Sequence, residues 1–157
     1  MNRYLFRGKT KETHEWVYGG FCEMDGRYFI VKTVTYPIDN TCSWGAYEVD
    51  PKTVGQFTGL KDKDNVKIFD GDILLFGDEV LIVYWNSEVY GWQAKKQNVT
   101  DPFKRFPCKD WNYIDLGWIS AEVPCTGTMT TQVGGNIHDN PEVCDNAKDY
   151  AWADFDF

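Results

Sequence analysis

The two histidines and five cysteines are the side chains of this sequence best suited to nucleophilic catalysis or metal binding. His138 and Cys144 are only six positions apart, close enough for the imidazole to act as a base toward the thiol. The competing interpretation is a thiol that packs beneath a short helix, and we favour it. His14 lies far away in the sequence, and no helical i, i+4 histidine pair exists to hold zinc.

The spacing of the cysteines and acids excludes the common metal motifs. The smallest gap between two cysteines is 17 residues, so no CxxC pair exists. Asp62-Lys63-Asp64 begins like a calcium-binding EF-hand loop, but Val66, Lys67 and Ile73 occupy positions that require other residues. We therefore expect no metal, no cofactor, and ordinary thiols in a reducing cytosol.

Catalytic signatures are also missing from the sequence. There is no GxGxxG, P-loop, GxSxG or HExxH motif. The 24 acidic residues offer many carboxylate pairs, but no spacing selects one pair for glycoside hydrolysis. We expect a protein that is not an enzyme and has no catalytic residues.

Composition narrows the class further. The 157 residues suit one domain, or one domain with a small appendage, and 17% aromatic residues exclude a disordered acidic chain. The net charge of −8 repels phosphate backbones, so nucleic acid is not the expected partner. The N-terminus has no apolar run typical of a signal peptide, and no segment has the roughly 20 apolar residues that span a bilayer. We expect a cytoplasmic protein without membrane contact.

Short alternating segments predict strands along most of the chain. Residues 16–23 and 27–35 flank Asp25-Gly26, a pair that favours a type I′ hairpin turn. Residues 36–45 and 59–67 are expected to form loops, and Gly77-Asp78 predicts a second two-residue hairpin turn. Asp70-Gly71-Asp72 predicts a tight turn, and both faces of residues 80–85 are apolar, as in a central strand covered on both sides.

The C-terminal region differs from the rest. Asn140-Pro141-Glu142-Val143 has a helix N-cap, a proline at the first helical position and an acid in the first turn. These features predict a short helix that reaches about Tyr150. Residues 142–157 contain five acids and one lysine, a net charge of −4.

Three segments of the chain, in order, carry a family resemblance. They are residues 4–8 with 16–19, residues 49–63 continuing through 68–73, and residues 135–143. Together they resemble the YopX-like family of small phage and prophage proteins, over roughly residues 1–144. The resemblance implies a mainly β protein with a small SH3-like barrel built around Gly71-Asp72-Ile73, and it brings no established activity. Asp64-Asn65 stands where the family often has Asn-Gly, and residues 94–127 and the end from Tyr150 depart from its pattern.

These observations combine into one architecture and one function. We expect an N-terminal β-hairpin segment (residues 1–46), an SH3-like barrel region (47–144) with one short C-terminal helix, and an acidic aromatic tail (145–157). The expected function is that of a noncatalytic phage or prophage accessory protein in a bacterial host, which binds an unknown protein partner; self-association stays open.

The alternative function is a barrel that faces nucleic acid, or one that mimics nucleic acid toward a host DNA-binding protein. It rests on a local basic run between residues 95 and 109 with interleaved aromatic rings. The basic residues are Lys95, Lys96, Lys104, Arg105 and Lys109, and the rings are Phe103, Phe106 and Trp111.

The candidate partner-binding residues lie in the acidic aromatic tail. Tyr150 and Trp152, like Phe155 and Phe157, are two positions apart, so each pair shares one side of an extended segment. The tail either docks on its own barrel and covers a sheet edge, or docks on another copy or a basic partner. A frayed terminus is the third alternative.

Deletion of residues 149–157 separates these alternatives. A tail that docks on its own chain stabilises it, so deletion lowers the melting temperature and leaves the mass measured by light scattering unchanged. For a tail that docks on another copy, the oligomer dissociates on deletion. If neither quantity changes, the tail has no docking site within the isolated protein.

Overall fold

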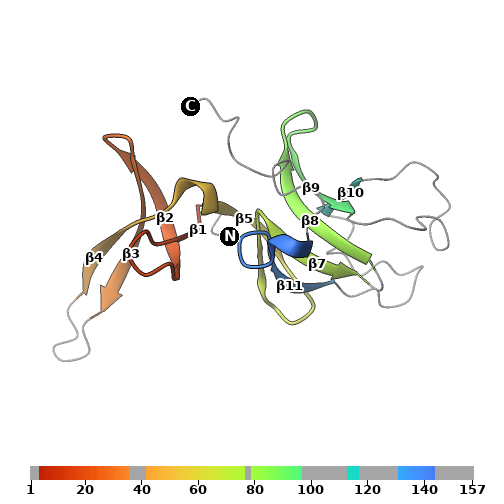
Figure 1. Ribbon diagram of the computed structural model, residues 1–157, viewed down its shortest axis with the longest axis horizontal. Helices are drawn as coiled ribbons and strands as arrows, with labels where there is room; N and C mark the ends of the chain where they lie inside the picture. Colours follow the sequence, from red (N-terminus) through yellow and green to blue (C-terminus); the bar gives the residue numbers. More distant parts are fainter. Residues whose placement is uncertain (1–3, 36–41, 77–78, 97–112, 117–130, 144–157) are drawn as a thin grey trace. The chain divides into compact units, whose positions relative to one another are not determined.

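The computed structural model describes residues 4–35, 42–76, 79–96, 113–116 and 131–143 as a mainly β protein (Figure 1). The chain divides into two compact units, one containing the described residues up to Phe57 and the other those from Thr58 onward. No helix in these described ranges is long and apolar enough to cross a membrane.

One sheet contains six strands in the order β4-β3-β2-β1-β5-β6. The hairpin β2–β3 turns at Asp25 and Gly26, whose φ angles of +52° and +71° confirm the predicted turn with two left-handed residues. Residue 19 must be glycine, because a Cβ there would lie 2.2 Å from the Val31 carbonyl oxygen. The bounds are β1 (Phe6–Lys9), β2 (Trp16–Met24), β3 (Arg27–Thr35), β4 (Cys42–Glu48), β5 (Gly55–Lys61) and β6 (Lys67–Phe69).

A short 3-10 helix, η1 (Pro51–Thr53), leads from β4 to β5. The Asp50 carboxylate caps it by accepting a hydrogen bond from the Lys52 backbone N–H at 3.0 Å. The Thr53 hydroxyl donates to the Asp50 carbonyl oxygen at 2.7 Å and accepts from the Lys9 N–H at 2.8 Å. Thr53 therefore ties η1 to β1.

The second sheet contains five strands in the order β10-β9-β8-β7-β11. Its central strand β8 confirms the prediction of a strand covered on both sides. Leu81 belongs to one apolar cluster, with Leu74, while Ile82 belongs to another, with Ile73 and Ile137. The bounds are β7 (Asp72–Phe76), β8 (Glu79–Asn86), β9 (Gly91–Lys96), β10 (Tyr113–Asp115) and β11 (Gln132–Asn136).

Two predicted loops are partly wrong. Residues 42–45, expected within a loop, form the first half of β4, because β3 is long enough to pair with all seven of its residues from Cys42 to Glu48. The loop expected from Gly59 begins later, since β5 continues to Lys61.

The barrel and the C-terminal helix also differ from expectation. No closed barrel forms among the described residues, because β10 and β11 end as opposite edges of their sheet. The helix predicted after Asn140 is a single 3-10 turn, η2 (Pro141–Val143), in the described part of that segment. Residues 144–150 and the Gly77-Asp78 turn lie outside the described residues.

Burial of Ile82 gives a test of the second sheet. Its side chain is 0% exposed, so Ile82→Ala should lower the free energy of unfolding by about 2–5 kcal/mol, measured by chemical denaturation. Val89→Ala is the control, because Val89 is 58% exposed and its truncation should change stability by less than about 0.5 kcal/mol. A loss below about 1 kcal/mol for Ile82→Ala would contradict the central position of β8.

Candidate interaction face

The strands β2, β3 and β4 present two different faces. Residues directly opposite one another in neighbouring strands share a face, and successive residues alternate between faces. Val17 and Ile30 lie on the covered face and are buried in the core of the first unit. We call the opposite side the open face; it carries Trp16, Tyr18, Gly20, Cys22, Met24, Arg27, Phe29, Val31, Thr33, Thr35, Cys42, Trp44, Ala46 and Glu48.

Large apolar side chains on the open face contact solvent. Trp44 is 77% exposed, Met24 50% and Tyr18 47%. The register places Trp44 opposite Thr33, and Ala46 opposite the half-buried Val31. Because hydration of clustered apolar surface is unfavourable, such a face is typical of a site that another surface covers.

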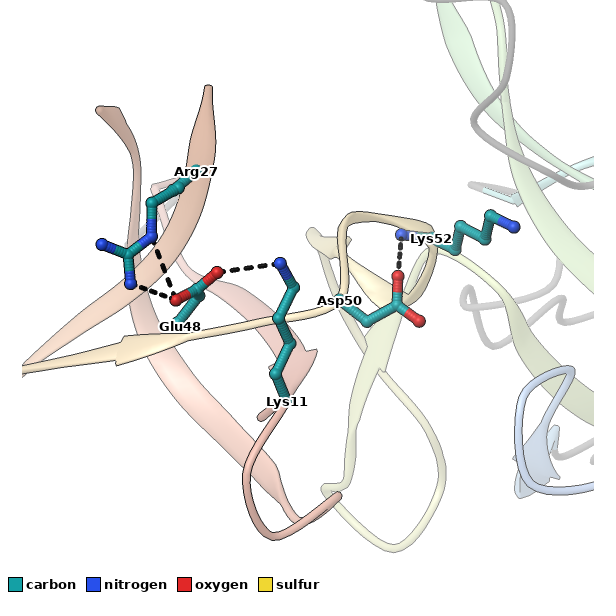
Figure 2. A network of polar contacts seen from close by, with 5 residues as sticks. All are labelled: Lys11, Arg27, Glu48, Asp50 and Lys52. Atoms are coloured by element: carbon teal, nitrogen blue, oxygen red, sulfur yellow. Dashed lines mark hydrogen bonds and ion pairs between the residues drawn. The ribbon is translucent and has the colours of Figure 1, made fainter. Parts of the chain in front are cut away.

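A charged cluster closes one end of the open face (Figure 2). The Lys11 Nζ lies 2.8 Å from Glu48 Oε1, and the Arg27 Nε donates to Glu48 Oε2 at 3.1 Å. A second Arg27 nitrogen, Nη2, contacts the same oxygen. Arg27 also lies over the Phe29 ring, 5.2 Å from its centroid, so the cluster meets the apolar part of the face.

These contacts set the charge of the cluster. Hydrogen bonds from Arg27 and then from Lys11 lower the pKa of Glu48 to about 2. The hydrogen bond to Glu48 in turn raises the pKa of Arg27. Glu48 therefore stays ionised at any physiological pH, and it contacts two cationic side chains at the rim of the face.

The cations of β1 are engaged with an aromatic ring. Arg7 and Lys9 lie 4.8 Å and 5.4 Å from the ring centroid of Trp16. Arg7 is buried, and its pairing opposite Tyr18 places it on the same side as the open face. These charges stabilise the sheet through cation–π contacts and are poorly placed to contact a phosphate backbone.

The calcium-like Asp62 has a structural position in the second unit. Its carboxylate accepts hydrogen bonds from the backbone N–H groups of Asp64, at 2.9 Å, and Val66, at 2.8 Å. Its other oxygen accepts from the Val133 N–H at 2.9 Å. Asp62 therefore fixes the β5–β6 turn and connects it to β11.

The segment 135–143 is likewise a folded turn. The Asn136 side-chain oxygen accepts from the backbone N–H groups of His138 and Asp139, both at 3.0 Å. The Ile137 N–H donates to the Gly71 carbonyl oxygen at 3.0 Å, which joins two of the segments that carry the family resemblance. His138 is half-buried beside this turn, and Cys144 lies outside the described residues.

The predicted basic run and the predicted tail residues lie partly or wholly outside the described residues. Within the described ranges, no three His, Cys, Asp or Glu side chains come together as a metal site. Lys95 and Lys96 lie on β9, where Lys96 is buried, and the rest of the basic run is outside the described residues. The predicted partner-binding residues Tyr150, Trp152, Phe155 and Phe157 also lie outside them.

Sequence reasoning missed the open face because it placed residues 36–45 in one loop. The signal was present: Trp44, Ala46 and Glu48 alternate with Ser43, Gly45 and Tyr47 in the strand period of two. Gly45 and the preceding turn-forming residues concealed it, since glycine weakens a strand pattern.

The two linked turns and the strands before them are the segments that resemble a known family. A family model described as YopX protein matches residues 5–145. The chain belongs to the YopX family. The matched residues of this YopX-family chain include the whole open face and stop before the aromatic residues of its tail. No curated protein matches the sequence.

Titration of Glu48 tests the charged cluster. A depressed carboxyl pKa stabilises the folded chain above the usual value near 4.5, and this contribution disappears as the pH falls toward 2. Arg27→Ala should raise the pKa of Glu48 toward its usual value, and Lys11→Ala should raise it less. Side-chain carboxyl NMR measures both shifts, with Asp25→Asn as the control; an unchanged pKa in Arg27→Ala would contradict the cluster.

Proposed function

We propose that this protein is a noncatalytic accessory protein of a phage or prophage that binds another protein through the open face. The exposure of Trp44, Met24 and Tyr18 on one side of one sheet carries the proposal. Membership of the YopX family supports the phage or prophage origin by resemblance, and the bacterial cytoplasm is the compartment that this origin and the cysteine usage favour.

The chemistry of the open face resembles that of protein interfaces. Such interfaces have an aromatic and apolar centre, rich in Trp, Tyr and Met, and a polar rim. Here Trp44, Val31 and Phe29 supply the centre, and the Arg27–Glu48–Lys11 cluster supplies a charged rim. Charges at the rim of an interface help to select the partner.

Most of the proposed barrel belongs to the second unit, which begins within β5 at Thr58. We propose that strands β5 to β9 together with β11 follow an SH3-like arrangement around the turn at Gly71, whose φ is +77°. Support comes from the family resemblance and from the Asp62 bond that brings β11 to the β5–β6 turn. In this proposal the second unit is a scaffold and the first unit carries the binding face.

A nucleic-acid-facing barrel, or a nucleic-acid mimic, remains the alternative function. The net charge of −8 opposes nucleic-acid binding, and the cations at the open face already interact with Glu48 or with aromatic rings. Binding to DNA or RNA that weakens steeply with salt would favour the nucleic-acid-facing barrel over the protein partner.

Site-specific photocrosslinking tests the protein partner. A photoreactive phenylalanine analogue replaces Thr33, which is exposed in the middle of the open face, in the full chain produced in bacterial cells. The matched control places the same analogue at Tyr90, which is 82% exposed in the other unit. Adducts with one defined protein at position 33, absent at position 90, are expected, and mass spectrometry identifies them.

Two results of the same experiment would contradict the proposal. Adducts of equal yield at both positions would show nonspecific capture, and the absence of any protein adduct at position 33 would reject the open face as a binding site. Thr33→Glu should abolish the interaction, because it places a carboxylate beside Trp44 and within the apolar centre.

A further inference from the structure

Strand β4 forms an edge of the six-stranded sheet, with β3 as its neighbour. The hydrogen bond from the Val49 N–H to the Tyr28 carbonyl oxygen, 2.9 Å, fixes the phase of this antiparallel ladder. Because hydrogen-bonded and non-hydrogen-bonded pairs alternate, the backbone groups of Ser43, Gly45 and Tyr47 point toward β3. Those of Cys42, Trp44 and Ala46 point away from it, toward the outside of the sheet. The Glu48 carbonyl also points outward, but it accepts a hydrogen bond from the Lys11 N–H at 3.0 Å, so this end of β4 already has a neighbour.

Between Cys42 and Tyr47, this edge lacks the features that usually prevent strand addition. Natural edge strands carry proline, lysine, bulges or inward-pointing charges. The seven residues of β4 contain no proline and no lysine, they pair with β3 without a register shift, and the single charge, Glu48, stands at the end. Cys42, Ser43, Trp44 and Ala46 are all exposed, so the strand is accessible over most of its length.

We propose that β4 pairs antiparallel with β4 of a second copy of this chain, about a two-fold axis at Gly45. This register places Trp44 opposite Ala46 of the second copy and Ser43 opposite Tyr47 of the second copy. Each large side chain then faces a small one, so the pairing is sterically self-complementary. It also pairs residues whose backbone groups point outward, since positions 44 and 46 have the same phase in the ladder.

The charges favour the same arrangement. In the antiparallel register the two Glu48 residues lie beyond opposite ends of the contact, where Lys11 covers each of them, and their carboxylates are about 20 Å apart along the strands. A parallel pairing in register would place the two carboxylates side by side, which is unfavourable. The antiparallel pairing also joins the two open faces into one continuous surface. This inference goes beyond the proposed function, which needs only one copy.

Sedimentation velocity of the full chain, from low to high micromolar concentration, tests the pairing. A strand contact limited to the part of β4 before Glu48 is small, so a concentration-dependent monomer–dimer equilibrium is expected. Ala46→Pro removes an N–H that points away from β3 and therefore leaves the β3–β4 ladder intact. Two hydrogen bonds between the copies are lost, which should raise the dimer Kd roughly 10- to 100-fold.

Two further variants make the result decisive. Ala46→Ser keeps the N–H and the small side chain, so its dimer Kd should stay within about twofold of the wild type. Trp44→Lys changes an exposed side chain and adds a charge at the edge, and it should weaken the dimer even if Ala46→Pro fails to fold.

Two outcomes would overturn the pairing. A wild-type chain that is monomeric throughout the series rejects it and leaves the edge to a strand of another protein. Dimers of Ala46→Pro and Trp44→Lys as tight as the wild type place self-association on a different surface. Neither outcome affects partner adducts at Thr33, because Thr33 lies on β3, one strand away from the edge.

Discussion

The pairing of β3 with both of its neighbours is the constraint on which the first unit depends. Ile30 at the middle of β3 is fully buried, and the register places Phe21 on one side of it and Tyr47 on the other. A slip of one residue in either ladder would turn the apolar set of that strand to the opposite face. The same register that buries Ile30 therefore sends Val31, Thr33 and Trp44 to the open face.

In the second unit, hydrogen bonds from two polar side chains hold the turns in place. Asp62 and Asn136 each use one side chain to satisfy several backbone N–H groups in turns that no ladder pairs. Such groups would otherwise require solvent, so these two residues allow the turns to pack beside β7 and β11. Their acidic and amide character is explained by folding, without a metal or a substrate.

Local rules predicted the parts of the fold that local chemistry decides. The Asp25-Gly26 turn follows from two adjacent residues that tolerate positive φ, and the burial of β8 follows from apolar residues on both of its faces. The extent of β4 was missed because it depends on β3, a strand separated from it by other residues. Closure of a barrel is a long-range property of the same kind, since it depends on which distant strands become neighbours.

The candidate site was less predictable for the same physical reason. An aromatic residue such as Trp44 has the same local pattern whether it enters a core or faces solvent. Trp44 faces solvent because the opposite face of the sheet, with Val17 and Ile30, is the one that is buried in the core. In contrast, the turn residues of the family segments are fixed by backbone geometry: Gly71 adopts a left-handed conformation and Asn136 organises the turn beside it.

The open face and the core place different limits on which residues the chain can use. Thr33 and Trp44 are both exposed, so most polar or aromatic replacements there would leave the core unchanged. Replacement of Gly19 is different, because a Cβ at that position would collide with the β3 backbone. The fold therefore constrains the residues of the turns and of the covered face tightly. The residues of the open face can instead suit the surface that the face binds.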